Sequence, residues 1–396
     1  MADIQTISSL RTPGAKSART ASSQSKMPVH LPFLLTAVLL VGYGLLVSFS
    51  ATYSNADYNF SKQAMGVVVG IVLMIIMWRI DYHQMSDYVM FFLIVNVVLI
   101  MLPALPMIGA ELNGARSWVR IGPLGFQPGE FAKVTVILLA ACVVSRYGGH
   151  MDRLDDYLKS LCILAVPFVC ILTQPDLGTG LVYLFISGVA LIIGGARAKY
   201  ILVTVGIMAG CIIALFTLDP ILDDVLGKDV LLKEYQRSRL LVFLDPTYDL
   251  AGDGYNLQQA KIAIGSGGLF GKGFMNATQS TLGYLPESPT DFVFCVLAEQ
   301  FGFVGALVLL GLYASLVFNG FSIAKSSNSL FGTVLVVCIC GMWVFQVLEN
   351  IGMDCGLMPI TGIPLPFVSY GTSMMLVNFV CLGLILSVWS HNGKNS

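Results

Sequence analysis

"LPFLLTAVLLVGYGLLVSFS", residues 31–50, is an apolar run that contains no charged side chain. An α-helix of about 20 such residues is long enough to span the roughly 30 Å hydrocarbon core of a bilayer. Runs of this kind recur along the 396-residue chain, which is 56% hydrophobic and only 11% charged. Soluble domains carry roughly 25% charged residues. This chain has too few charges to cover a water-facing surface, so we interpret it as an integral membrane protein.

The apolar runs predict an all-α polytopic membrane protein with about ten transmembrane helices. Basic residues favour the connections that lie on the same side as the N-terminus, so the positive-inside rule places both the N- and C-termini in the cytosol. The expected spans are residues 30–50, 63–79, 87–107, 131–146, 158–173, 177–196, 199–218, 292–322, 330–351 and 372–390.

The spans are expected to form a single membrane domain over residues 29–391. Residues 1–28 are rich in Ser, Thr and Ala, which is typical of a disordered cytosolic tail, and residues 392–396 are expected to be a short cytosolic tail. Residues 219–291 are a polar connection between the seventh and eighth helices, which the topology makes a large extracytoplasmic loop. Loops of that length are usually functional.

Several common kinds of site have no support in the sequence. The nine cysteines lie mostly in apolar runs without CxxC spacing, and the four histidines are scattered, so neither disulfides nor a zinc site is expected. The Gly-rich segment "GSGGLFGKGF" (265–274) lacks Ser or Thr after Lys272 and has Phe270 in place of the last Gly of a dinucleotide fingerprint. We interpret it as a loop of tight turns at the membrane surface. A net charge of −1 gives no reason to expect nucleic acid as a partner.

Ionisable residues gather in the stretch "GARSWVRIGPLGFQPGEFAKV" (114–134), which the topology places at the outer face. Glu130 and Lys133 stand three residues apart at a helix start and can pair on one face. The pair either neutralises itself at the interface or belongs to a site, and Trp118 alone would be an ordinary interfacial aromatic. The stretch also contains Arg116 and Arg120.

The segment "LPESPTDFVF" (285–294) contains the most informative acid. Ser288 as N-cap, Pro289 as the first helical residue and Asp291 three positions after the cap read as a capping box. Asp291 is therefore either a structural acid or a reactive carboxylate held at the membrane boundary. Glu299 follows two helical turns later, near enough to the same face to point into the same cavity.

Three more outer segments carry polar residues. Asp176 in "TQPDLGTG" (173–180) reads first as the cap of the next helix, and Glu349 and Asp354 lie near the outer end of the ninth helix. The segment "GIPLPFVSYGTS" (362–373) breaks the last span with two prolines and contains Ser369. Irregular backbone at membrane depth must line a cavity or pack on protein. Cations and carboxylates converging on the outer face suit a substrate with an anionic head and a lipid tail.

Six motifs across residues 30–391 resemble the SEDS (shape, elongation, division, sporulation) family. The resemblance implies a ten-helix peptidoglycan glycosyltransferase that polymerises lipid II outside the bacterial cytoplasmic (inner) membrane, beside a class B penicillin-binding protein and other elongation-complex membrane proteins. It makes Asp291 catalytic, and it matches Trp118, Glu130 and Lys133 to the family's important Trp, Glu and Lys. The motifs are "GARSWVRIGPLGFQPGEFAK", "QPDLGTG", "YQRSRLLVFLDP", "GYNLQQAKIAIGSGGLFGKG", "TQSTLGYLPESPTDFVFCVLAEQFGFVG" and "MPITGIPLPFVSYGTS".

The segments "YQRSRLLVFLDP", "IAIGSGGLFGKG" and "PITGIPLPFVSYG" are more similar to the elongation type of the family (RodA) than to the division type (FtsW). One departure concerns the residue before the Thr-Asp pair. The family usually has His or a basic residue there, whereas this chain has Pro289, and Asp354 adds a charge that is not part of the motif.

The mechanism expected from the resemblance uses Asp291 as general base on the acceptor 4-hydroxyl, with undecaprenyl pyrophosphate leaving from the linked glycan. A lipid II flippase, a division-type polymerase and a purely structural scaffold are the alternatives. A divalent cation, Mg or Mn, near Asp291 or Glu130 is the one cofactor considered, although the sequence shows no dedicated oxygen cage. Expected substrate-binding residues are Trp118, Arg116, Arg120, Glu130, Lys133, Lys261 and Ser369, with Ser288, Pro289, Asp176 and Glu299 in supporting roles and Arg237, Arg239 and Lys272 as further cations.

Overall fold

The structure is a computed structural model that describes residues 29–53, 57–105, 108–112, 115–121, 124–174, 176–226, 234–245, 248–249 and 252–392. The predicted tail at residues 1–28 lies outside the described residues, as does most of the predicted tail at 392–396.

A helix occupies each of the ten predicted apolar spans. The molecule is therefore a polytopic helical membrane protein, as predicted. Seven of these helices, among the described residues, are long and apolar enough to cross a membrane, and α3 and α6 are shorter apolar helices. The ten are α1 (Leu31–Tyr53), α2 (Phe60–Arg79), α3 (Val89–Met101), α4 (Pro128–Ser145), α5 (Leu154–Leu172), α6 (Leu177–Ile193), α7 (Ala198–Leu226), α11 (Val293–Lys325), α12 (Leu330–Asp354) and α13 (Thr372–His391).

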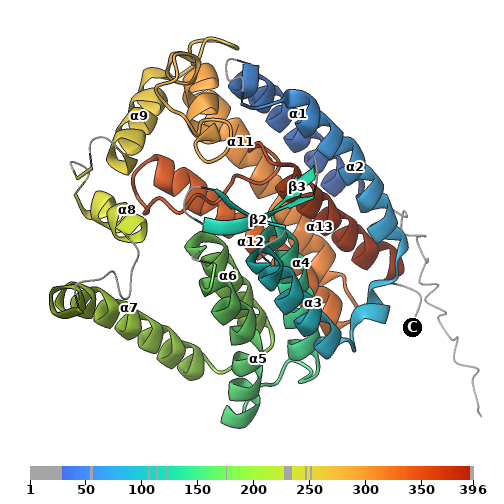
Figure 1. Ribbon diagram of the computed structural model, residues 1–396. Helices are drawn as coiled ribbons and strands as arrows, with labels where there is room; N and C mark the ends of the chain where they lie inside the picture. The colour runs from blue at the N-terminus through green and yellow to red at the C-terminus, as the bar shows by residue number, and fades with distance from the viewer. Residues whose placement is uncertain are drawn as a thin grey trace, which may run out of the picture.

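Burial differs strongly between these helices. Helices α4, α12 and α13 form the centre of the bundle, with most of their apolar residues buried. Helices α1 and α2 lie side by side at one edge, and α7 runs away from the rest of the bundle (Figure 1). Since lipid tails are as apolar as these side chains, the exposed faces of α1, α2 and α7 suit contact with lipid.

A small β-sheet between α3 and α4 was not predicted. It consists of β1 (Gly109–Leu112), β2 (Ala115–Ile121) and β3 (Leu124–Phe126), antiparallel in the order β1-β2-β3. Trp118 pairs with Ala110, and Arg120 pairs with Gly125. The third span accordingly ends as α3 at Met101, followed by the 3₁₀ turn η2 (Leu102–Ala104), and the all-α prediction is wrong for this segment.

The region between the seventh and eighth spans is largely helical. Helix α7 continues to Leu226, eight residues beyond its predicted end at 218. It is followed by α8 (Glu234–Leu244), α9 (Asp253–Ser266) and the short α10 (Thr278–Thr281). Figure 1 shows α9 beside α11, with α8 next to α9 on the side away from α11.

The Gly-rich segment after α9 packs into a break in α11. At Gly302 the backbone of α11 leaves the helical conformation, with φ of 65°. The amides of Lys272 and Gly273 donate to the carbonyls of Glu299 and Gln300, at 2.9 and 3.0 Å. Beyond the break, the amide of Phe303 donates to Gly268 O at 2.9 Å. The segment is therefore a loop of turns, as predicted, and it supplies hydrogen bonds that the broken helix lacks.

Glu299 holds the rest of this loop. Its buried carboxylate accepts from Lys272 Nζ at 2.5 Å, from Thr278 Oγ1 at 2.7 Å and from the amide of Gln279 at 3.2 Å. We call residues 267–279 together with Glu299 the loop latch. The expectation that Glu299 points into a cavity shared with Asp291 is wrong, because its carboxylate is fully engaged in the latch.

Replacing Glu299 by Ala should destabilise the protein by about 3 kcal/mol, because Lys272 and the amides of 278 and 279 lose a buried charged acceptor. Chemical unfolding in detergent micelles measures this. Lys272→Met is the matched control: it removes the cation but leaves the loop amides bonded, so its effect should be smaller. If both variants changed the free energy of unfolding by the same small amount, the Glu299 carboxylate would not be stabilising the loop latch.

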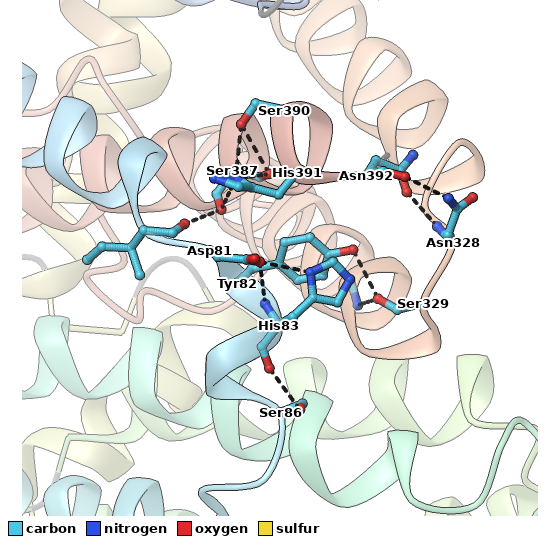
Figure 2. A network of polar contacts seen from close by, with 12 residues as sticks. Asp81, Tyr82, His83, Ser86, Asn328, Ser329, Ser387, Ser390, His391 and Asn392 are labelled. Carbon is cyan, nitrogen blue, oxygen red and sulfur yellow. Dashed lines mark hydrogen bonds and ion pairs between the residues drawn. The ribbon is translucent and has the colours of Figure 1, made fainter. Parts of the chain in front are cut away.

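Polar side chains tie the opposite end of the bundle together (Figure 2). Ser387 Oγ near the end of α13 donates to Ile80 O, at 2.6 Å, just beyond α2. Asn328, between α11 and α12, donates its amide N–H to Asn392 Oδ1 at 2.7 Å. Asp81 caps the 3₁₀ turn η1 (Tyr82–Met85) by accepting from the amide of His83 at 3.0 Å. These contacts fix the termini of α2, α11, α12 and α13 relative to one another.

Candidate active site

Asp291 lies in a tight turn immediately before α11. The carbonyl of Glu287 accepts from the amides of Asp291 and Phe292, at 3.1 and 3.2 Å, and the helix begins only at Val293. The predicted capping box at Ser288 and Pro289 is therefore wrong. Ser288 is buried with its amide bonded to Leu285 O, and α11 has no side-chain cap. The turn, not a helix N-terminus, presents the Asp291 carboxylate.

Two segments later in the chain donate hydrogen bonds to the backbone of this turn. Asn350 on α12 donates its side-chain amide to the carbonyls of Asp291 and Ile363, at 2.7 and 2.9 Å. The amide of Tyr370 donates to Pro289 O at 2.8 Å. The turn that contains Asp291 is thus fixed to α12 and to residues 359–371, the proline-containing segment before α13.

Gly362 lies directly beside the carboxylate. Its φ of 72° is in the left-handed region that favours glycine. A Cβ placed on it would lie 3.1 Å from Asp291 Oδ2 and 3.9 Å from Arg239 Nη1. Asp291 from the turn, Arg239 from α8 and the backbone at Gly362 therefore meet at one place.

The surroundings of Asp291 favour its protonated form. Burial, followed by the charge of Glu287, raises the pKa of Asp291 to about 7, although Arg239 and a hydrogen bond from Thr290 oppose the shift. Tyr58, between α1 and α2, donates to Glu287 Oε2 at 3.0 Å, and burial raises the pKa of its phenol. A carboxyl that titrates near neutral pH can exchange a proton with a substrate under physiological conditions.

Two further carboxylates lie near Asp291. Glu349 and Asp354 on α12 are both buried, and each interacts electrostatically with Asp291. Glu349 accepts a hydrogen bond from Thr361 Oγ1, and Asp354 Oδ2 accepts from the thiol of Cys295 at 3.3 Å. The sequence placed both acids near the outer end of the ninth helix, but it did not predict their electrostatic interaction with Asp291.

Glu130 and Lys133 pair as predicted. Lys133 Nζ lies 2.5 Å from Glu130 Oε1, and both side chains are buried, at 1% and 3% exposure. Tyr183 on α6 donates to the carbonyl of neighbouring Gly129 at 3.0 Å. The pair lies inside the bundle at the start of α4, where each buried charge is neutralised by the other.

The aromatic and basic residues predicted on the sheet differ in their exposure to solvent. Trp118 on β2 is half-buried, and Arg120 on the same strand is exposed. Arg116 lies on β2, and its side chain is outside the described part of the structure. Gln127, just after β3, donates its amide to Ser373 Oγ at 3.1 Å, which ties the end of the sheet to α13.

The remaining candidates divide into surface and structural positions. Lys261 on α9 is exposed and lies against Gly356. Asp176 caps α6, with Oδ1 accepting from the amide of Thr179 at 3.0 Å, which confirms its reading as a cap. Ser369 is fully buried, with Oγ accepting from Leu365 N at 2.8 Å, so it packs the segment and offers no surface to a substrate.

The other predicted cations have partners. Arg237 pairs with Asp219, 2.5 Å from its Oδ2, and Lys272 belongs to the loop latch. Arg239 Nε lies 3.6 Å from Asp253 Oδ2.

Within the described residues, no group of three or more His, Cys, Asp or Glu side chains could hold a metal ion. The divalent cation considered near Asp291 or Glu130 therefore has no preformed set of such ligands there.

Comparison with known proteins gives consistent matches over the whole bundle. The model of the FtsW/RodA/SpoVE family, described as "Cell cycle protein", matches residues 30–394. The peptidoglycan glycosyltransferase MrdB of Escherichia coli K12 is 36% identical, covering 92% of this chain and 94% of its own length. The peptidoglycan glycosyltransferase RodA of Treponema pallidum is 32% identical, covering 90% of this chain and 96% of its own.

Solved structures show the same fold. A chain from a peptidoglycan synthase complex that coordinates polymerization and crosslinking superposes with a TM-score of 0.76 at 29% identity, covering 93% of this chain and 99% of that one. The rod shape determining protein RodA of Thermus thermophilus gives a TM-score of 0.66 at 27% identity, with 93% and 98% covered. Because the family model matches residues 30–394, nearly the whole length, this chain belongs to the FtsW/RodA/SpoVE (SEDS) family.

Proposed function

We propose that this chain is a peptidoglycan glycosyltransferase of the elongation type, which polymerises lipid II into glycan strands. The observation that carries the proposal is the Asp291 turn, whose backbone is held by the Glu287 carbonyl and the Asn350 side chain of α12 and whose carboxylate is set beside Arg239. The names of the relatives above support the activity, and the similarity to MrdB and RodA supports the elongation type.

The chemistry requires one base and neutralisation of one leaving group. Asp291 takes the proton from the 4-hydroxyl of the GlcNAc on the incoming lipid II. That oxygen forms the new glycosidic bond to the anomeric carbon of the growing strand. The bond from that carbon to the pyrophosphate oxygen breaks, and its electron pair leaves with undecaprenyl pyrophosphate. Attack opposite the leaving group inverts the configuration, so a second carboxylate acting as a nucleophile is not required.

Arg239 is the cation best placed to act with Asp291. It lies beside Asp291 at Gly362, where a guanidinium can hold Asp291 in a fixed orientation and attract phosphate oxygens. It provides a basic group beside Asp291, although this chain has Pro289 where the family usually has His or a basic residue. Lys261, exposed on neighbouring α9, is a second basic group on the same side.

The pH dependence of polymerisation provides one test. Because the pKa of Asp291 is about 7, Asp291 is protonated and inactive as a base below that pH and ionised above it. We expect kcat/KM to rise with pH through about 7 and then level off. Initial rates of glycan formation at lipid II concentrations well below KM measure this profile. A rate that is flat between about pH 5.5 and 8.5 would contradict a base with this pKa.

A class B penicillin-binding protein is the partner we propose, with the active site on the outer face of the membrane. The solved synthase complex that coordinates polymerization and crosslinking supports a partner of this kind.

The activity itself is tested by giving lipid II in detergent to the purified protein with such a partner and separating the glycan chains on a gel. If wild type forms no glycan but moves labelled lipid II across liposomes, the chain is a flippase and the proposal is wrong.

A further inference from the structure

The Gly-rich loop after α9 presents apolar side chains to its surroundings. Leu269 and Phe270, which we call the apolar tip, are 64% and 79% exposed. The one charged residue of the segment 265–274 is Lys272, and Glu299 holds it in the loop latch. Exposing large apolar side chains to water is unfavourable. What surrounds the apolar tip therefore depends on its depth relative to the bilayer.

Contacts between α1 and α11 fix the depth of the break in α11. Before the break, Gln300 Nε2 donates to Ser50 Oγ at 2.5 Å. After the break, the hydroxyl of Tyr43 donates to Gly305 O at 3.3 Å. Gly302 is therefore level with the part of α1 between Tyr43 and Ser50. Since α1 ends three residues after Ser50, the break lies about 5–15 Å below that end, at 1.5 Å per residue.

Helix α1 is a suitable ruler for the bilayer. It has 23 residues and no charged side chain. Its length of about 35 Å is close to the roughly 30 Å of the hydrocarbon core. Leu46, which lies between Tyr43 and Ser50, is apolar and exposed, as a side chain in contact with lipid would be. The break in α11 therefore lies inside the bilayer, in the half that contains the start of α11.

The Gly-rich loop shares this depth. The amides of Phe303 and Val304, just beyond the break, donate to the carbonyls of Gly268 and Leu269 at 2.9 and 3.1 Å. The side chains of Phe303 and Val304 are themselves exposed, and so is that of Leu307 one turn later. The apolar tip thus continues the exposed apolar face of a membrane-spanning helix.

The backbone of the loop also suits the bilayer. Irregular backbone is tolerated at membrane depth only where protein or a water-filled cavity satisfies its polar groups. The amide of Gly271 donates to Gly267 O at 2.8 Å, and those of Lys272 and Gly273 donate to carbonyls of α11. Together with the two carbonyls that accept from α11, these bonds turn polar groups of the loop toward protein. The side chains of the apolar tip point away from it.

We propose that the Gly-rich loop is a re-entrant element, whose apolar tip lies among lipid acyl chains beside α11 instead of in water at the membrane surface. This inference does not depend on the proposed function. Interfacial elements bury their apolar side about 5–10 Å into the boundary between headgroups and acyl chains, which agrees with the depth of the break. Because the loop is bonded to α11 on both sides of Gly302, lipid around the tip also holds the part of α11 that follows the Asp291 turn.

The test places a fluorescent side chain at the tip of the full-length protein. Purified Phe270→Trp is reconstituted at one copy per lipid nanodisc. Lipids with brominated acyl chains quench an indole that they touch, and acrylamide quenches an indole from water. The emission of the four native tryptophans is measured in wild type and subtracted.

Two variants provide the reference environments. Leu307→Trp marks the lipid-facing surface of α11. Tyr284→Trp marks the water side, since Tyr284 is exposed and lies three residues before Glu287, which bonds Tyr58 beyond the end of α1. We expect brominated lipid to remove as large a fraction of the emission at position 270 as at position 307. Acrylamide should quench position 284 strongly and position 270 weakly.

Two results would overturn the inference. If acrylamide quenches position 270 as strongly as position 284 and brominated lipid does not, the tip lies in water. If neither quencher reaches position 270, protein covers the tip, either another part of this chain or a second copy. Leu269→Trp provides an independent measurement of the same tip if Phe270→Trp does not fold, and it must show the same preference for brominated lipid.

Discussion

An Asp291→Asn variant is expected to fold like wild type and to polymerise lipid II about 10²- to 10⁴-fold more slowly. Asn matches Asp in shape, and the hydrogen bonds that fix the turn use the backbone of residue 291, through Glu287 and Asn350. The substitution therefore removes the proton acceptor and little else. Glycan formation from lipid II on a gel, at equal amounts of folded protein, measures the loss.

Asp176→Asn is the matched control for this variant. It is also an Asp to Asn change, at a position where Asp caps α6 and where Asn caps about equally well. Its polymerisation rate should stay close to that of wild type. If Asp291→Asn polymerised as fast as Asp176→Asn, Asp291 would not be the base, and another group would have to accept the proton.

Lys133→Met should reduce stability by about 3–5 kcal/mol, because it leaves the Glu130 carboxylate buried and unpaired. Glu130→Gln should have an effect of the same kind by leaving the ammonium group of Lys133 alone. The double variant removes both charges, so its loss should be well below the sum of the single losses. Chemical unfolding of the four proteins in detergent micelles gives this coupling energy directly.

The polymerisation rate of the double variant then separates structure from chemistry. A pair that is only structural predicts recovery of both stability and activity when both charges are removed. If stability returns while polymerisation stays low, one of the two charges acts on the substrate, as the family resemblance implies. Additive losses of stability would contradict the direct pairing at 2.5 Å.

The helices were predictable because hydrocarbon imposes length and polarity on every span. Each of the ten spans lacks enough charge to lie in water, and the helix ends differ from prediction mostly by a few residues. The sheet at 109–126 was not predictable from the same rule, since it lies outside the hydrocarbon and its strands are short. Helix α7 likewise exceeds its predicted apolar span and continues through the mixed polar and apolar segment DPILDDVL (219–226).

The candidate site shows where local patterns fail. Ser288 and Pro289 have the chemistry of a helix start, yet Glu287 O accepts the amides of the turn, and Pro289 O accepts from Tyr370, about 80 residues later. Ser369 looked available to substrate, but a contact four residues away uses its hydroxyl. In contrast, Glu130 and Lys133 are neighbours on one helix face, so their pairing could be read from spacing alone.

Contacts between distant segments account for the rest of the site. Arg239 and Asn350 reach Asp291 only through the packing of α8 and α12 around the turn. Nothing in their own neighbourhoods in the sequence distinguishes Arg239 from Arg237, which pairs with Asp219. The sequence thus singled out Asp291 as the candidate base, while the groups that surround it could be found only from the three-dimensional arrangement.

The loop latch also bears on the order in which the molecule is built. Lys272 and Glu299 are 27 residues apart, so the latch and the turn between them close within one short stretch of chain. Contacts of short sequence separation form early in folding, and membrane helices emerge from the ribosome in order. Asn350 and Tyr370 arrive later and fix the turn from behind. The Asp291 site is therefore completed last, when α12 and α13 have been inserted, and a chain interrupted before them holds its carboxylate without the contacts that orient it.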